Sequence, residues 1–130
     1  METKFGFEKL EVWQLSRKLV QFIYSITQHF PDAEKYGLII QMRRAAISIC
    51  SNIAEGNTRY TPKDQAHFSV MAYGSLIELL NHAILANDLK MLNTEELLNL
   101  RIAVKNLSVK LNNLKQTQLN RINNPPMNKS

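Results

Sequence analysis

The chain has 130 residues, of which 45% are hydrophobic and 21% charged, as is usual for one folded, soluble domain. Its net charge of +5 comes from the C-terminal end: residues 1–96 hold ten Lys and Arg against eleven Asp and Glu, whereas residues 97–130 hold six and none. One cysteine, Cys50, excludes an intramolecular disulfide, and the N-terminal residues lack a secretory signal, so we expect a reduced, cytoplasmic protein with Cys50 as a small buried side chain.

The first predicted helix runs from about Phe7 to Phe30. Apolar residues repeat along it at spacings of three and four, the period of an amphipathic helix: Val12, Leu15, Leu19, Phe22 and Ile26. A second apolar stripe contains Trp13, Val20 and Ile23. Pro31 ends this helix, because a proline loses a backbone hydrogen bond and clashes with the preceding turn.

The second predicted helix, from about Asp32 or Ala33 to Glu55, carries two stripes. Apolar residues face the bundle: Ile39, Met42, Ala46, Ile49 and Ile53. Short polar and ionic residues follow the same period on a neighbouring face: Gln41, Arg44, Ser48, Asn52 and Glu55. Solubility alone would need only a loose mix of Lys and Glu, so the polar stripe predicts organised contacts. Gly56 then suits the end of the helix, because glycine takes the left-handed conformation without a side-chain clash.

The third predicted helix runs to about Leu89 or Lys90 and has a clear start, where Thr61 can cap, Pro62 fits the first position and Asp64 lies in the first turn. It has a first apolar stripe of Ala72, Leu76, Leu79, Ala83 and Ala86, and a second of Val70, Tyr73, Ile77, Leu80 and Ile84. Since a bundle helix has one inward face, the second stripe predicts self-association; the alternative is a wider core stripe. Polar residues interrupt its most apolar region, residues 70–86, so we expect no membrane span.

The fourth predicted helix has the most regular repeat in the chain. Asn93 can cap it, and the N-terminal dipole favours Glu95 and Glu96 in its first turn. A seven-residue seam follows, made of Leu97, Leu100, Val104, Leu107, Leu111 and Leu114. The seam decays at Gln118, so we predict one domain over residues 1–120 and a flexible tail over residues 121–130.

These four helices predict the architecture. No segment shows the strict alternation of a half-buried strand, and the short connections favour antiparallel neighbours. We therefore predict an all-α, antiparallel, up-down-up-down four-helix bundle. Leu98, Ile102 and Val109 lie outside the seam of the last helix and add to the expectation of self-association.

Residues that carry catalysis or bind metals are sparse. No pair among His29, His67 and His82 has the three- or four-residue spacing that would bring two imidazoles to one metal. Glu78 and His82 are four residues apart, and we interpret them as a surface or interface hydrogen bond rather than an acid–base pair. With no phosphate-cradling glycine loop, nucleophile elbow or paired cysteine motif, we predict no catalytic residue, no metal site, no cofactor and no enzymatic activity.

The polar stripe of the second helix allows three interpretations. The preferred one is a structural network of Gln41, Ser48, Asn52, Glu55, Gly56 and Glu78. In it, Arg43 or Arg44 pairs with Glu78, while Asn52 and Glu55 fix the turn after the helix through backbone hydrogen bonds. The second interpretation places the stripe at a subunit interface. The third exposes Arg43 and Arg44 to phosphate.

Basic residues on the fourth helix do not form one stripe. At about 100° per residue, Arg101, Lys105 and Lys115 share a side, whereas Lys110 and Arg121 lie roughly opposite. An oligomer would repeat this patch, and its binding to phosphates would weaken steeply with salt. No aromatic residue is interleaved with these lysines, so we expect backbone-directed contact without base stacking on this helix.

Several motifs occur in a recognisable order, at residues 7–13 (FEKLEVW), 30–31 with 34–38, 41–49 (QMRRAAISI), 51–56 (SNIAEG) and 74–79 (GSLIEL). In these the chain resembles the 23S rRNA-intervening-sequence proteins, four-helix bundles similar to the accessory variability determinant of diversity-generating retroelements. The resemblance covers about residues 7–92 and implies a ring-shaped homopentamer. The retroelement relatives are basic and work with a reverse transcriptase and nucleic acid.

We therefore predict a non-enzymatic, homo-oligomeric scaffold, pentameric by resemblance, that contacts RNA or a ribonucleoprotein. Arg101, Lys105 and Lys115 are the expected phosphate contacts, with Arg43 and Arg44 as secondary ones. The alternative is an adaptor without nucleic-acid binding, whose ring or exposed apolar stripe docks a protein partner. No membrane association is expected in either case.

Overall fold

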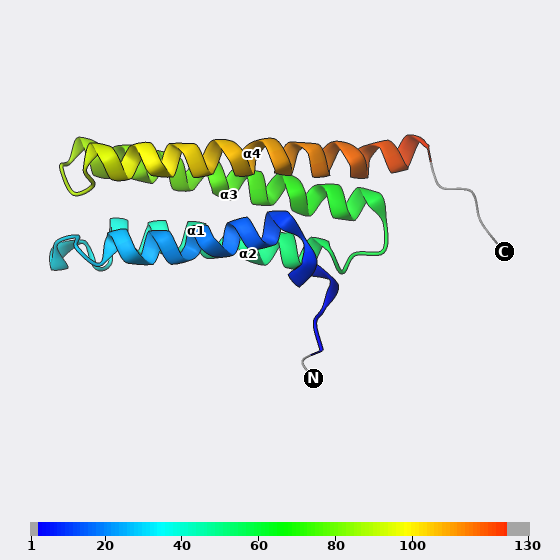
Figure 1. Ribbon diagram of the computed structural model, residues 1–130, viewed down its shortest axis with the longest axis horizontal. Coiled ribbons are helices and arrows are strands. Elements are labelled where there is room, and N and C mark those ends of the chain that lie inside the picture. The colour runs from blue at the N-terminus through cyan, green and yellow to red at the C-terminus, as the bar shows by residue number, and fades with distance from the viewer. Residues whose placement is uncertain (1–2, 125–130) are drawn as a thin grey trace.

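The computed structural model describes residues 3–124, which form helices and no strand (Figure 1). The long helices are α1 (Glu11–Thr27), α2 (Leu38–Gly56), α3 (Pro62–Asp88) and α4 (Thr94–Asn123), and the short 3-10 helices are η1 (Gly6–Lys9) and η2 (Asp32–Glu34). Successive long helices run in opposite directions, each contacts the next, and α4 returns to α1. The predicted all-α, antiparallel four-helix bundle is therefore confirmed.

The predicted first helix, Phe7 to Phe30, is too long at both ends. Leu10 has extended backbone torsions (φ −75°, ψ 130°), and these separate η1 from α1. At the other end α1 stops at Thr27, and Phe30 turns into the core. The spacing failed to predict this end because Phe30 continues the interval of four from Ile26 although it lies outside the helix.

The second helix begins at Leu38, so the predicted start at Asp32 or Ala33 is wrong. Residues 32–34 form η2, and Gly37 (φ −107°, ψ −116°) then interrupts the helical backbone. The Glu34 carboxylate accepts a hydrogen bond from the backbone N–H of Leu38 at 3.1 Å. This contact satisfies one of the free donors in the first turn of α2.

Gly56 does not take the left-handed conformation that we predicted. No glycine among residues 3–124 has a positive φ, and Gly56 is the last residue of α2. It is needed for a different reason: a Cβ added there would lie 2.7 Å from the Cβ of Phe68. Glycine therefore lets the end of α2 approach the first turns of α3.

Both helix starts predicted after residue 60 are confirmed. The Thr61 hydroxyl accepts the N–H of Asp64 at 3.1 Å, with Pro62 as the first residue of α3. The Asn93 side chain accepts the N–H of Glu96 at 2.7 Å, and the Glu96 carboxylate accepts the N–H of Asn93 at 3.1 Å, which forms a capping box. α4 continues three residues past the predicted boundary at residue 120, whereas positions 125–130 of the predicted tail lie outside the described residues.

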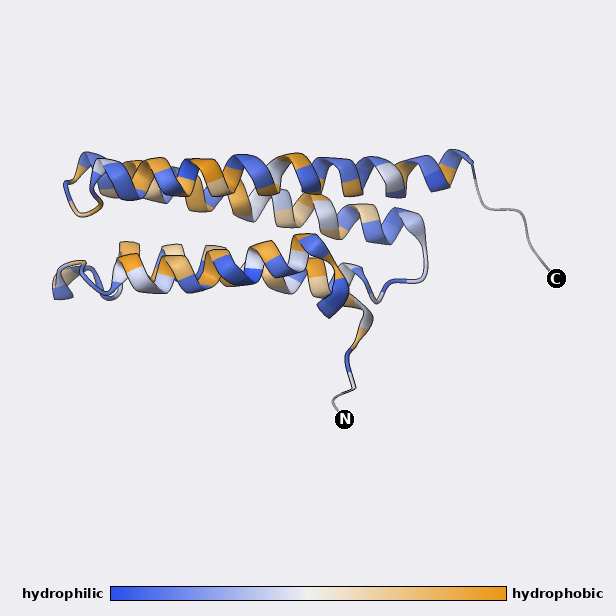
Figure 2. Cartoon of the chain, in the orientation of Figure 1, coloured by the Kyte–Doolittle hydropathy of each residue, from blue (hydrophilic) through white to orange (hydrophobic). Residues whose placement is uncertain are grey.

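The core is made mainly by the apolar stripes that the sequence predicts, although Leu15, Phe22 and Ile39 of these stripes are only half-buried. Buried residues include Met42, Ile49 and Leu76, together with most of the α4 seam. Ile23, which we expected on the second apolar stripe of the first helix, is completely buried, whereas Trp13 and Val20 of that stripe are half-buried. Figure 2 shows hydrophobic and hydrophilic residues alternating along α4, as expected for a helix with one buried side.

The second apolar stripe of α3 is partly exposed. Leu80 and Ile84 pack against the core, but Val70 and Ile77 remain exposed. By length and composition α3 would also pass as a membrane-crossing helix, contrary to the expectation from its polar interruptions. A core helix of a soluble bundle meets the same criterion, and α3 packs against both α2 and α4.

Candidate functional site

The basic residues predicted to contact phosphate lie along one side of α4. Arg101 and Lys105 are exposed and Lys115 is half-buried. Within residues 3–124 none of the three forms an ion pair with an acidic side chain. Their charges are therefore available to an anion, since no neighbouring carboxylate neutralises them.

Lys110 faces a different neighbour. Its Nζ lies 2.9 Å from a carboxylate oxygen of Glu11, so this lysine ties α4 to the start of α1. Leu98, Ile102 and Val109 are exposed on α4, beside Arg101 and Lys105 in the helical repeat. The outer side of α4 thus carries both apolar side chains and unpaired cations.

The polar stripe of α2 holds two helices together at its centre. The hydroxyls of Ser48 on α2 and Ser75 on α3 are 2.9 Å apart, within hydrogen-bond distance. The Asn52 amide donates to the backbone carbonyl of Ser48 at 3.0 Å and to its hydroxyl at 3.2 Å. Ser48 and Asn52 therefore belong to a structural network between helices, whereas Gln41 and Glu55 are exposed.

Of the other contacts expected of this network, the described residues lack the arginine–Glu78 pair and a hydrogen bond from Asn52 to the turn, whereas the backbone of Glu55 holds that turn as expected. Glu78 does not pair with an arginine; its carboxylate lies 3.3 Å from Nε2 of His82, one turn along α3. The turn after Gly56 is held by the backbone and hydroxyl of Thr58, which both donate to the carbonyl of Glu55. The Glu55 carboxylate instead lies 4.0 Å from Arg59, at a surface position where such pairs contribute little.

The two adjacent arginines of α2 have different surroundings. Arg43 is half-buried: its Nε donates to the Thr27 hydroxyl at 3.0 Å, and its guanidinium carbon lies 4.3 Å from the centre of the Tyr24 ring. Arg44 is exposed and has no ion pair among residues 3–124. Their places in the sequence do not distinguish the two arginines or point to Tyr24, because the contact depends on how α1 and α2 pack.

A family model described as 23S rRNA-intervening sequence protein matches residues 8–113. The chain belongs to this family. The match spans α1 to α3 and most of α4, so it includes Arg101 and Lys105 and ends before Lys115. Comparison with curated proteins finds no match. The likeness to the retroelement accessory determinant stays a prediction.

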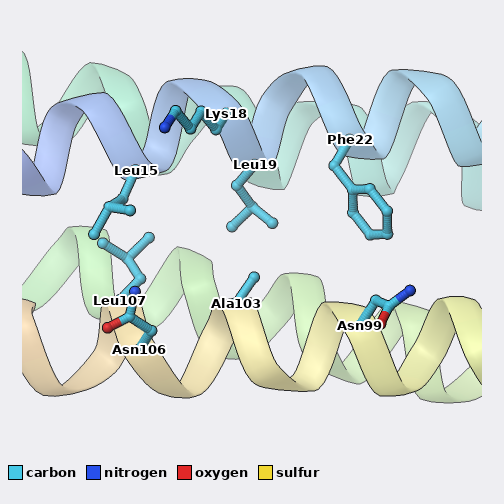
Figure 3. A pocket seen from close by; sticks show the side chains of 8 residues that line it. All are labelled: Leu15, Lys18, Leu19, Phe22, Asn99, Ala103, Asn106 and Leu107. Carbon is cyan, nitrogen blue, oxygen red and sulfur yellow. The ribbon is translucent and has the colours of Figure 1, made fainter.

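This family member also has an apolar groove that the sequence analysis did not predict. It lies between α1 and α4, has a volume of about 300 Å³, and Figure 3 shows Leu15, Leu19 and Phe22 of α1 pointing across it toward Ala103 and Leu107 of α4. Lys18, Asn99 and Asn106 complete its lining. The sequence signal for this groove was on α4. Asn99, Ala103 and Asn106 stand there at positions where larger apolar residues would fill the space between the helices.

No arrangement for redox or metal chemistry emerges among the described residues. No group of three or more His, Cys, Asp or Glu there is placed to hold a metal ion. The Cys50 sulfur is half-buried, 3.1 Å from the Ser16 hydroxyl. Burial raises the pKa of the Cys50 thiol, against smaller opposing effects of Ser16 and Arg17, which favours the unreactive thiol form.

Proposed function

We propose that this chain is a non-enzymatic, homo-oligomeric scaffold, assembled as a pentamer, that contacts RNA or a ribonucleoprotein. The supporting observation is the outer surface of α4, where exposed Arg101 and Lys105 alternate with exposed Leu98, Ile102 and Val109. Apolar side chains gathered on one surface favour burial against another subunit. Cations at the rim of such a contact stay in water and are repeated in every subunit.

The repetition matters for RNA contact because one chain presents only a few phosphate contacts. Several copies of Arg101, Lys105 and Lys115 would release more counterions together than one copy can. The resulting binding would follow the RNA backbone and have little sequence preference, since the three cations have no ring between them. The pentameric number rests on the family resemblance.

RNA contact is tested by reversing three charges on α4: R101E, K105E and K115E. A matched control reverses three exposed charges outside α4: K4E, K9E and K63E. We expect the α4 variant to bind structured RNA more weakly, and its slope of log K against log salt to become shallower by about 2 to 3 per subunit engaged. Equal slopes for the two variants would contradict the assignment to α4.

Assembly is tested by light scattering, since a pentamer has five times the chain mass of 15.0 kDa. Ile102→Glu should dissociate it without unfolding the chain, because Ile102 is 61% exposed in the single subunit. Leu89→Glu, at a similarly exposed site past the end of α3, serves as the control. A monomeric wild-type protein would contradict the oligomer, and a pentameric Ile102→Glu would exclude this surface as the contact.

A second candidate function is a protein-interaction adaptor that binds no nucleic acid. The groove between α1 and α4 favours it, because an amphipathic helix from a partner could bury its apolar side against Leu15, Phe22 and Leu107. Recovery of one stoichiometric protein after nuclease treatment, together with no RNA binding by the purified oligomer, would replace the first proposal with this one.

A further inference from the structure

Aromatic rings and cations gather around the turn that follows η2 and the first half of α2, on the side where α2 packs against α1. They surround a hollow of about 300 Å³ that we call the tyrosine hollow. Its lining includes the rings of Tyr24 and Tyr36, the cations Lys35, Arg43 and Arg44, and three isoleucines of α2. Neither the polar network of α2 nor the basic side of α4 includes these rings.

One wall of the tyrosine hollow is held in place by contacts within the chain. The guanidinium of Arg43 lies over the Tyr24 ring, 4.3 Å from its centre, and Nε of the same arginine donates to Thr27. The Thr27 hydroxyl in turn donates to the carbonyl of Ile23 at 2.7 Å, and Thr27 is buried. The Tyr24 ring is therefore oriented before any ligand arrives, which reduces the entropy that binding would cost.

The other wall is exposed. Tyr36 is 83% exposed, and Nζ of Lys35 lies 5.8 Å from the centre of its ring. Lys35 and Tyr36 both lie in the turn between η2 and α2, outside the helical backbone. A flat ligand placed on this ring would bury apolar surface that now faces water.

The charge around the hollow is positive. Lys35, Arg43 and Arg44 form no ion pair among residues 3–124. Glu34 is the acidic residue adjacent in sequence, and its carboxylate is engaged by the N–H of Leu38 at 3.1 Å. A phosphate group at the hollow would therefore meet cations that no neighbouring carboxylate neutralises.

We propose that the tyrosine hollow binds an unpaired nucleotide of single-stranded RNA. The base stacks on Tyr36 and covers the isoleucines, while the flanking phosphates meet Lys35 and Arg44. The proposal rests on the proposed function in taking RNA as the ligand, and it adds a site of different chemistry. Stacking requires a free base face, which a paired strand does not offer, whereas the cations of α4 suit any phosphate backbone. An acidic peptide would satisfy the cations and leave the rings unused.

The test uses the full chain and a single-stranded RNA hexamer that carries 2-aminopurine, a base whose fluorescence falls when it stacks. Tyr36→Ala removes the platform, and Tyr60→Ala is the matched control, because Tyr60 is a fully exposed tyrosine between α2 and α3. We expect quenching with the wild type and with Tyr60→Ala. With Tyr36→Ala we expect no quenching and an affinity lower by roughly 5- to 150-fold. Both variants should keep the wild-type circular dichroism.

Either proposal can fail without the other. Quenching that survives Tyr36→Ala, or that is missing in the wild type, would overturn the tyrosine hollow as a stacking site even if duplex RNA binds through α4. Quenching that depends on Tyr36 while the α4 charge reversals change no RNA affinity would support the hollow and overturn the α4 assignment. Tyr36-dependent binding of an acidic peptide, with no hexamer bound, would overturn the RNA proposal and assign the hollow to a protein partner.

Discussion

Between α2 and α3 the helices meet through small side chains, whereas α1 and α4 stand apart over a groove. α3 buries Ala72, Ala83 and Ala86 completely, and Gly56 lets α2 approach Phe68. On the open side α4 directs the exposed Ala103 toward larger residues of α1, which do not fill the space. Small residues therefore close a helix pair only where the facing backbone lies near enough, as between α2 and α3 but not between α1 and α4.

Truncation of a leucine should lower the stability most on the closed side of the bundle, where α2 and α3 pack together, and less on the open side, at the groove between α1 and α4. Leu79→Ala, at a position with no exposed surface, should lower the free energy of unfolding by about 2–5 kcal/mol, because it leaves a cavity as well as losing apolar burial. Leu15→Ala in the groove should cost about 1 kcal/mol, since solvent already reaches that space. Urea denaturation at one fixed protein concentration measures both, and equal losses would mean that the groove is as tightly packed as the core.

Enlarging an alanine should have opposite effects on the two sides. Ala83→Leu overpacks a closed position and should destabilise the protein by about 1–3 kcal/mol. Ala103→Leu extends into the groove and should be neutral or stabilising by up to about 1 kcal/mol. Thermal unfolding followed by circular dichroism compares them directly. A stabilising Ala83→Leu would show that the core between α2, α3 and α4 contains unfilled space at this position.

The sequence predicted the fold well because each long helix carries its own signals. Period-3.6 stripes specified the buried sides, and Thr61, Pro62 and Asn93 specified two starts that the structure confirms. Breaks set by backbone torsions were missed, as at Leu10 and Gly37, because apolar spacing continues through them. Distances between helices depend on packing between segments far apart in the sequence, so the small and polar residues of α4 did not by themselves predict the groove.

The candidate sites were less predictable than the fold. Arg43 and Arg44 are neighbours in sequence with similar chemistry, yet only one lies over Tyr24. The difference arises because adjacent residues on a helix point about 100° apart, and the residue that each meets belongs to another helix. Tyr36 lies in the motif at residues 34–38, but nothing in the sequence marked it as a ligand contact, since a single exposed aromatic residue in a turn has no periodicity.

The hydrogen bond that crosses the closed side should have a moderate effect. Ser75→Ala removes the partner of the Ser48 hydroxyl and should lower the free energy of unfolding by about 0.5–1.5 kcal/mol. The loss is limited because the Asn52 amide still donates to Ser48. Ser108→Ala, whose hydroxyl bonds only within α4, is the control and should cost less. If Ser108→Ala lowers the free energy of unfolding more than Ser75→Ala does, the hydrogen bond between α2 and α3 does not contribute as proposed.

The ion pair that crosses the open side should have the smallest effect. Lys110→Ala breaks the contact with Glu11, whose side chain is 68% exposed, and should cost less than about 1 kcal/mol. The cost should shrink further in high salt, because screening weakens exposed pairs. A loss that is larger and independent of salt would show that Lys110 contributes through packing of its aliphatic stem.

The corner between α3 and α4 bears on the order in which the chain folds. Lys90 is the one residue among positions 3–124 with a positive φ, at 64°, and the turn is closed locally, with the N–H groups of Met91 and Leu92 both donating to Ala86. Asn87 also donates to the carbonyl of Leu92, so the reversal depends on few distant residues. Closing a short loop costs little entropy, so the α3–α4 hairpin can form early, before α1 packs against α4. The small backbone strain at Lys90 is then introduced at this first step.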